Sequence, residues 1–286
     1  MNTTTEANRL PSVQTRVTSN LAELPWWLLV IILVGVILVY SFYNNETYAD
    51  IFNFIKEGIF TTIQVTLIAY AIAITIGLIT GLGRVSKNPV IYNIATLYVQ
   101  IMRGVPILVT ILYVSFVIAP WAIDRINDLG VWLAGIGLLP AENVLVALNT
   151  RNVDFLVRGI AALAISYGAF SAEIFRAGIE SIGRGQMEAA RSLGMNYFQA
   201  MRYIILPQAI RRVLPPLGND FIAMLKESSL VSVLGVRDIT QLGKLYAASS
   251  FQFFATYNAV AFLYLTMTIL LSLGVKVLEK RLKTDG

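Results

Sequence analysis

Arg103 and Glu173 are the residues whose types and positions suggest chemistry, because each is charged and lies within a long apolar stretch. Arg103 lies near the middle of the run 89–120, where a lone charge costs at least ~2.5 kcal/mol and is expected to face the interior of a helix bundle. There Arg103 could bind a substrate carboxylate and Glu173 an ammonium group. The alternative is a permanent ion pair between the two side chains.

Two other sets of polar residues interrupt the apolar runs. Glu173, Arg176 and Glu180 share one helix face, which predicts a self-neutralising ladder of ion pairs. Further along, Pro215–Pro216 and Gly218 are expected to break a helix, since non-helical backbone in a membrane is tolerated where it lines a cavity or packs on protein. Asn219, Lys226 and Ser228–Ser229 would then face a pathway or a partner subunit, or else hold helices together.

Catalysis by this chain is not expected. The sequence has neither histidine nor cysteine, which removes the commonest general base, the thiolate nucleophile and the commonest metal ligands. No G-x-x-x-x-G-K-[ST] motif occurs, because Gly243-Lys244-Leu245 lacks both the first glycine and the Ser or Thr. We therefore predict no catalytic residue, no metal site and no bound nucleotide.

The elements that must position these residues are membrane helices. Of the 286 residues 56% are hydrophobic and only 14% charged, and the mean hydropathy is +0.68, so a membrane protein is expected. A spanning helix needs about 20 mostly apolar residues. We predict an all-α integral membrane protein of about six transmembrane helices, the fifth irregular: 26–43, 58–83, 89–120, 157–181, 203–235 and 251–275.

The basic residues predict the orientation of these spans. Lys and Arg cluster in alternate loops and at both ends of the chain, and Arg237 and Lys244 alone oppose the pattern. The positive-inside rule then places both termini in the cytoplasm. The polar tail 1–25 is expected to be disordered. The long loop 121–156 lies outside, with its apolar piece Val131–Leu139 at the membrane interface.

A polar, helix-forming segment at 185–207 separates the fourth and fifth spans. Residues 186–193 favour a short helix, and Gly194 stands where a helix ends in a left-handed residue. Asn196 can cap a second helix, 197–205, which runs toward Pro207. By itself this pattern predicts an amphipathic cytoplasmic loop of two helices.

The same segment resembles the EAA loop of bacterial ABC importer permeases. The residues that carry the resemblance match that consensus with its spacing: Glu188, Ala189, Ala190, Gly194, Ile204, Leu206 and Pro207. The resemblance implies coupling helices, over 185–206, that dock onto an ATPase subunit. In that role Ala189 and Ala190 would permit close approach, Glu188 would form an ion pair or cap, and Gly194 would make the turn.

Other motifs resemble the polar amino acid permeases of the histidine/glutamine/arginine type. These are 61–63, 81–84, 103–106, 172–179 and 225–230, within a region covering about 55–280. The resemblance implies a five-helix type I importer core. The additional N-terminal span and the expanded loop 121–156 are similar to the larger general L-amino-acid permeases, which leaves the substrate range open.

The resemblance also implies the partners. We expect a cytoplasmic ABC ATPase dimer that carries ATP and Mg²⁺, a periplasmic amino-acid-binding protein and a second permease subunit, with a heteromer favoured over a homodimer. Membrane lipid surrounds the chain, and no nucleic acid is expected. The expected function is ATP-driven import of polar L-amino acids across the bacterial inner membrane by alternating access. The alternative is an ion-coupled carrier or channel, against which stand the absence of a visible repeat and of histidine.

Overall fold

The computed structural model describes residues 26–283, and the regular elements in that range are all helices. The chain divides into two units at Asp50. Within the first unit, α2 (Trp26–Asn44) is an apolar helix, as predicted for 26–43, and α3 (Glu46–Ile55) begins after Asn45. The tail 1–25 lies outside the described residues. Whether α2 crosses a membrane stays a prediction.

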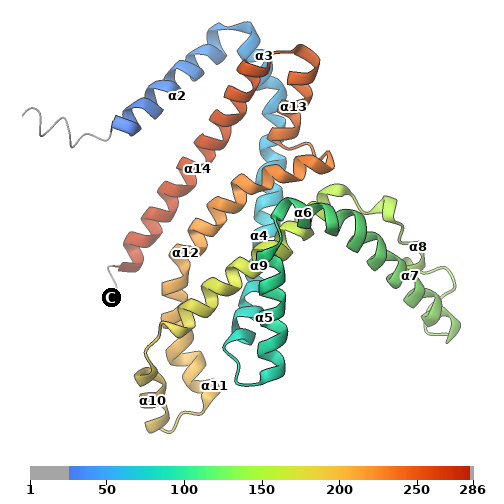
Figure 1. Cartoon of the computed structure of the whole chain (residues 1–286), viewed down its shortest axis with the longest axis vertical. Helices are drawn as coiled ribbons and strands as arrows, with labels where there is room; N and C mark the ends of the chain where they lie inside the picture. Colours follow the sequence, from blue (N-terminus) through green and yellow to red (C-terminus); the bar gives the residue numbers. More distant parts are fainter. Residues whose placement is uncertain (1–25, 284–286) are drawn as a thin grey trace, which may run out of the picture. The chain divides into compact units, whose positions relative to one another are not determined.

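Helices α4 (Glu57–Arg84) and α9 (Phe155–Glu180) form the centre of the second unit (Figure 1). Both match the spans predicted for 58–83 and 157–181. Their backbones approach closely because glycines of α4 face α9: a Cβ added at Gly77 would lie 2.6 Å from Ser171 Cβ, and one at Gly81 would lie 2.8 Å from Phe175 Cβ. Close packing through small residues is the usual way that membrane helices associate.

The third predicted span consists of two helical segments rather than one. Helix α5 (Pro89–Gly104) is capped by the Asn88 side chain and ends before Val105, and Pro106 precedes α6 (Ile107–Tyr113). The chain then continues without a break through the π-helix η1 (Val114–Ile118) into α7 (Ala119–Gly135). Proline lacks the N–H needed to continue α5, and the residue before a proline favours extended backbone, so the helix ends there.

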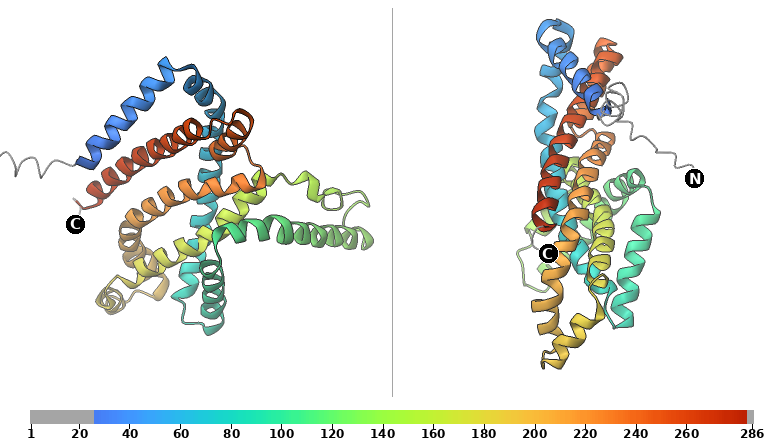
Figure 2. Two further views of the ribbon diagram at one scale, coloured as in Figure 1. Left: turned by 45° about the horizontal axis from the view of Figure 1, so that its top comes forward. Right: turned by 90° about the vertical axis from the view of Figure 1, so that its left-hand side faces the viewer.

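The predicted loop 121–156 is therefore helical in its first part. The piece Val131–Leu139 begins inside α7, which extends to Gly135, and its place at the membrane interface stays a prediction. The remaining connection contains α8 (Val144–Ala147) and the 3₁₀ turn η2 (Thr150–Asn152). Helices α7 and α8 extend to one side of α4 and α9 (Figures 1 and 2).

Arg158 fastens this connection to the start of α9 and was not anticipated from the sequence. Its buried guanidinium donates hydrogen bonds to backbone carbonyls of Val153 (3.0 Å), Ser115 (3.1 Å) and Thr150. The guanidinium also lies 4.7 Å from the ring centroid of Phe155. A buried charge must be satisfied by partners, and here carbonyl dipoles and a π-face supply them.

The fifth predicted span differs from expectation. Helix α11 (Tyr197–Ala200) continues through the π-helix η3 (Met201–Ile205) into α12 (Leu206–Glu227), and Pro215 and Pro216 lie inside α12 without breaking it. The predicted interruption is thus wrong. Because a proline has no N–H, the carbonyl four residues before it loses its hydrogen-bond donor. The two carbonyls concerned belong to Arg211 and Arg212, which are exposed, so that water can replace the missing donors.

Beyond α12 the 3₁₀ helix η4 (Ser228–Leu234) ends at Gly235, whose φ is +80°, and α13 (Ile239–Ser250) and α14 (Phe253–Lys283) follow. Four helical stretches of the described part are long and apolar enough to cross a membrane: Glu46–Arg84, Ile107–Gly135, Phe155–Glu180 and Phe253–Arg281. Counting six spans stays a prediction. Helix α13 and the connection α10–α11 lie at opposite ends of this unit (Figures 1 and 2).

Asp238, between η4 and α13, is a carboxylate with 0% of its surface exposed. Its Oδ1 accepts the Gln241 N–H at 2.8 Å, which caps α13, and its Oδ2 accepts the Tyr264 hydroxyl at 3.2 Å. Burial raises the pKa of Asp238 to about 6, and these hydrogen bonds oppose that rise. The folded protein therefore retains a proton that the unfolded chain loses near pH 4.

Replacing Asp238 by asparagine should change how stability depends on pH. Because the folded pKa lies above the unfolded one, the aspartate's favourable contribution is complete below pH 4 and is lost as pH rises through 6, by up to about 3 kcal/mol. Asparagine keeps the cap and does not titrate. The melting temperature of Asp238→Asn, minus that of wild type, should thus increase between pH 4.5 and 7.5 in detergent solution.

The matched control is Asp154, the exposed aspartate that caps α9 by accepting the Leu156 N–H. Asp154→Asn makes the same substitution at an exposed helix cap and shows the effect of replacing a capping carboxylate that is not buried. A difference for Asp238→Asn that stays constant with pH would contradict the raised pKa.

Candidate functional site

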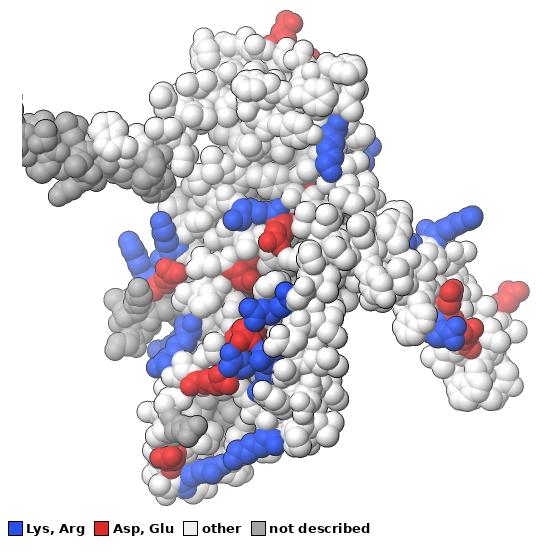
Figure 3. Space-filling view, viewed as in Figure 1, with Lys and Arg blue, Asp and Glu red and all other residues white. Residues whose placement is uncertain are grey.

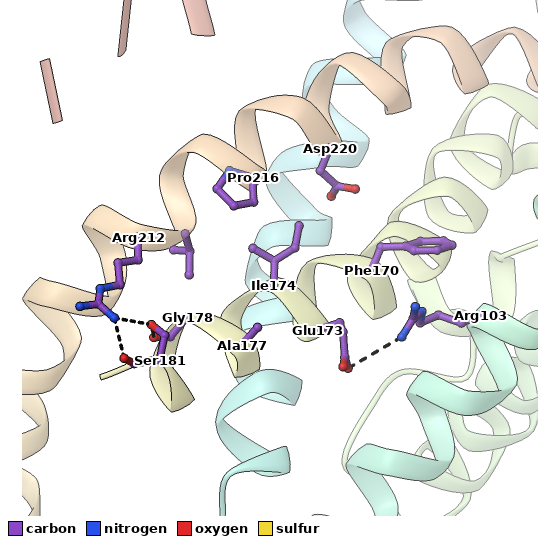
Figure 4. A pocket seen from close by; sticks show the side chains of 11 residues that line it. Arg103, Phe170, Glu173, Ile174, Ala177, Gly178, Ser181, Arg212, Pro216 and Asp220 are labelled. Carbon is purple, nitrogen blue, oxygen red and sulfur yellow. Dashed lines mark hydrogen bonds and ion pairs between the residues drawn. The ribbon is translucent and has the colours of Figure 1, made fainter. Parts of the chain in front are cut away.

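A cavity of about 570 Å³ lies between α9 and α12 and is closed on one side by Arg103 from the end of α5 (Figure 4). Its wall combines an apolar surface with four charged side chains, and the lining residues are Arg103, Phe170, Glu173, Ile174, Ala177, Gly178, Ser181, Arg212, Val213, Pro216 and Asp220. Such a cavity is large enough for a small polar molecule, and its few convergent polar groups could orient one.

Glu173 is shared by three arginines. Its carboxylate forms ion pairs with Arg84 and Arg176, and Arg176 Nε lies 3.2 Å from Glu173 Oε1. The predicted pair with Arg103 is present but long, with 3.9 Å between Arg103 Nη1 and Glu173 Oε2. Arg84 was not foreseen as a partner because it is far away in sequence. The Glu173 charge is therefore already compensated within the chain, which favours a structural role.

The ladder predicted on α9 is present. Arg176 also pairs with Glu180 one turn later, so that one guanidinium bridges two carboxylates. Figure 3 shows the alternation of blue and red side chains over α9 and α12.

Arg103 is less committed than its neighbours. Its side chain is 45% exposed, and its guanidinium lies 5.9 Å from the ring centroid of Phe170. Arg103 points across the mouth of the cavity toward Glu173 (Figure 4). An arginine held by one long ion pair can still bind a planar carboxylate through its N–H donors.

Asp220 and Arg212 line the cavity, although the sequence did not mark them as site residues. Asp220 accepts a hydrogen bond from Ser171 Oγ at 3.0 Å, and Arg212 Nη1 donates to Ser181 Oγ at 3.0 Å. Their spacing in the sequence could have indicated that they share a helix face. Arg212, Pro216 and Asp220 are four residues apart and share one face of a continuous helix. The predicted break at Pro215–Pro216 concealed it.

Asn219 and Lys226 are not at the cavity. Both are exposed, because on α12 they lie to one side of the face formed by Pro216 and Asp220. Ser228, also predicted to be polar lining, is fully buried and donates to the Leu225 carbonyl at 2.7 Å. A pathway role for Asn219 and Lys226 stays a prediction that needs a surface other than this cavity.

The segment predicted to couple to a partner folds as two helices joined at Gly194. Helix α10 (Arg184–Ser192) ends before Gly194, whose φ of +81° is left-handed. Asn196 then caps α11 in a capping box: Gln199 N–H donates to Asn196 Oδ1 and Asn196 N–H to Gln199 Oε1, both at 2.9 Å. The second helix does not stop before Pro207, since η3 carries it into α12.

The seven consensus residues of this segment divide into an outer and an inner set. Glu188, Ala189, Gly194 and Pro207 are exposed, whereas Ile204 and Leu206 are half-buried and Ala190 is buried. Ala190 thus serves this chain's own packing, and of the two alanines Ala189 is the one whose side chain is exposed to a partner. Glu188 makes no ion pair with any described residue.

The inner side of the segment packs on the ends of the long helices. Ile205 and Ala209 form an apolar cluster with Ile179 and Ile182, against which Leu82 and Val85 also pack. A force on the segment would therefore reach α4, α9 and α12 together.

Large apolar side chains cover the outer tip of the segment. Leu193 is 80% exposed and Phe198 is 81% exposed, and Tyr203 lines a hollow of about 240 Å³ with Leu193, Gly194, Met195 and Gln199. Exposed apolar groups gathered in this way are typical of a protein interaction surface. The consensus did not include Leu193 or Phe198.

Comparison with known proteins gives consistent matches. The family described as binding-protein-dependent transport system inner membrane component matches residues 73–284. The probable glutamine ABC transporter permease protein GlnM of Bacillus subtilis is 37% identical over 84% of this chain and 98% of its own length. The glutamine transport system permease protein GlnP of Escherichia coli is 32% identical over 79% of this chain and 92% of its own length.

Two solved structures share the fold. An amino acid ABC transporter crystallised with histidines is 34% identical, with a TM-score of 0.66 over 84% of this chain and 98% of that chain. The MetNI methionine ABC transporter in an inward-facing conformation has a TM-score of 0.59 over 79% of this chain and 94% of that chain. At 18% identity it shows the fold alone.

Proposed function

Because the chain belongs to the family of binding-protein-dependent transport system inner membrane components, we propose that it is the transmembrane subunit of an ATP-driven importer of polar L-amino acids. The observation that carries the proposal is the family match over 73–284, which includes both the cavity and the segment 185–206. The relatives named for glutamine and the structure with histidines support the substrate class.

Energy enters at the segment 185–206. An ATPase subunit in the cytoplasm, which carries ATP and Mg²⁺, docks on the apolar tip formed by Leu193 and Phe198, next to Glu188 and Ala189. The inner side of the segment packs on α4, α9 and α12, so movement of the ATPase moves the helices around the cavity. This chain binds no nucleotide.

Substrate enters from the opposite face. A periplasmic binding protein delivers the amino acid, the cavity accepts it while the pathway is open outward, and ATP hydrolysis returns the pathway to the inward-open state. Both termini lie in the cytoplasm, and a second permease subunit of similar sequence completes the pore. This assembly in the bacterial inner membrane agrees with the positive-inside pattern of the loops.

Reconstitution tests the proposal. The chain, together with an ABC ATPase, a second permease and a periplasmic binding protein from the same organism, should take up labelled L-glutamine into proteoliposomes. Uptake should require ATP, the ATPase and the binding protein, and a proton or sodium gradient should not replace ATP. Gradient-driven uptake by the purified chain alone would show instead an ion-coupled carrier. Omitting the second permease separates a heteromer, which then loses uptake, from a homodimer, which retains it.

A further inference from the structure

The Asp220 carboxylate differs from the other acid at the cavity in having no cation beside it. Within 26–283 no lysine or arginine nitrogen lies within 4.0 Å of Asp220, whereas Glu173 has three arginine partners. Asp220 lies within the span predicted for 203–235, where a charged side chain is expected to have a partner. The missing partner of Asp220 is the observation from which the inference starts.

The position of Asp220 is fixed rather than accidental. Ser171, which is fully buried on α9, donates its hydroxyl to Asp220 Oδ2 at 3.0 Å. Asp220 points from α12 into the cavity, and its other oxygen accepts no hydrogen bond from a described side chain (Figure 4). One oxygen is thus held by the protein while the other remains available to a ligand.

Arg103 supplies the opposite charge in the same cavity, with Phe170 between the two side chains (Figure 4). Its single long ion pair of 3.9 Å leaves most of its donors uncommitted. A cation and an anion that face one apolar cavity complement a zwitterion, and about 570 Å³ accommodates a free amino acid.

We propose that Asp220 binds the α-ammonium group of the translocated amino acid while Arg103 binds its α-carboxylate, an assignment that rests on the proposed function. Glu173, which the sequence favoured for the ammonium, is excluded because Arg84 and Arg176 already occupy its oxygens. The site accepts L-amino acids with a free α-amino group and rejects their hydroxy and N-acyl analogues. Selection of the side chain is left to other contacts.

The test separates the charge of Asp220 from its hydrogen bond. Asp220→Asn keeps an oxygen that accepts from Ser171 but removes the charge, whereas Ser171→Ala removes the hydrogen bond and keeps the charge. In proteoliposomes with saturating binding protein, Asp220→Asn should lower ATP-driven L-glutamine uptake at least tenfold and Ser171→Ala at most threefold. Asp154→Asn, an exposed carboxylate outside the cavity, should match wild type. Melting temperature and basal ATPase rate confirm that each variant is folded and assembled.

A binding measurement gives a second readout. Calorimetry on the detergent-solubilised complex without binding protein should show L-glutamine bound at least tenfold more tightly than its 2-hydroxy analogue. In Asp220→Asn this preference should disappear. Equal affinity of wild type for both compounds would overturn the assignment.

The uptake results divide in the same way. Uptake by Asp220→Asn within twofold of wild type, or an equal loss in Ser171→Ala, overturns the ammonium site. In either case wild-type uptake leaves the proposed function intact, whereas wild type that shows no ATP-dependent uptake of L-glutamine overturns both.

Discussion

Valine in place of Gly194 should reduce ATP-driven uptake at least tenfold while the chain still inserts into the membrane. The φ of +81° at Gly194 is a region that β-branched residues avoid, so valine strains the turn by about 1–3 kcal/mol or forces it to another shape. Leu193 and Phe198 lie on either side of this turn, so a change in its shape displaces the apolar surface on which the ATPase is proposed to dock. Uptake, ATPase rate and membrane yield are measured together, and uptake should fall while yield does not.

Gly185→Val is the matched control. Gly185 lies in the same segment, its φ is not positive, and a Cβ there meets no atom within 4 Å. It should retain most of the uptake. Glu188→Ala changes the same surface on α10. The exposed Glu188 side chain makes no ion pair with a described residue, so its loss should leave the melting temperature unchanged. Undiminished uptake in both Gly194→Val and Glu188→Ala would show that docking occurs elsewhere.

Glutamine in place of Glu173 should destabilise the protein clearly. The substitution leaves Arg84, Arg103 and Arg176 without their shared carboxylate. Removing one partner from a desolvated ion pair costs about 3–5 kcal/mol, and the partial exposure of this site lowers the expected cost to about 2 kcal/mol or more. Folded yield and melting temperature in detergent should both fall.

Two companions make this result specific. Glu180→Gln removes only an exposed pair with Arg176 and should change stability by less than about 1 kcal/mol. Adding Arg84→Gln to Glu173→Gln removes one unpaired guanidinium and should recover part of the loss. If Glu173→Gln melts at the wild-type temperature, the cluster is not a structural element, and the ligand role of Glu173 returns.

The long helices could be predicted from the sequence because length and apolar content alone determine them. Helices α4 and α9 begin and end within two residues of expectation. The effect of each proline on its helix could not be predicted, since it depends on whether the carbonyl that loses its N–H donor can find another partner. Pro106, directly after Gly104 and Val105, ends a helix, whereas Pro215 and Pro216 deprive carbonyls of exposed residues and leave α12 intact.

Only part of the site could be predicted, because one part depends on charge in apolar runs and the other on the course of the helices. Arg103 and Glu173 stand out as charges in apolar runs, and their contact followed from the need for a partner. Asp220 became visible as a cavity residue only once α12 was continuous, because the helical phase from Arg212 to Asp220 is lost if the helix breaks between them. Arg84 could be found only from the crossing of α4 and α9.

The unbroken run of α11, η3 and α12 makes one lever arm. It extends from Tyr197, beside the exposed tip, to Glu227, beyond Asp220. Its length is about 46 Å at ~1.5 Å per residue, so a tilt of about 5° applied at one end displaces the other by about 4 Å. A stroke of that size could carry Asp220 out of contact with a bound ammonium group. The extra residue in η3 sets the rotational phase between Phe198 and Asp220, and so fixes which face of the arm Asp220 occupies.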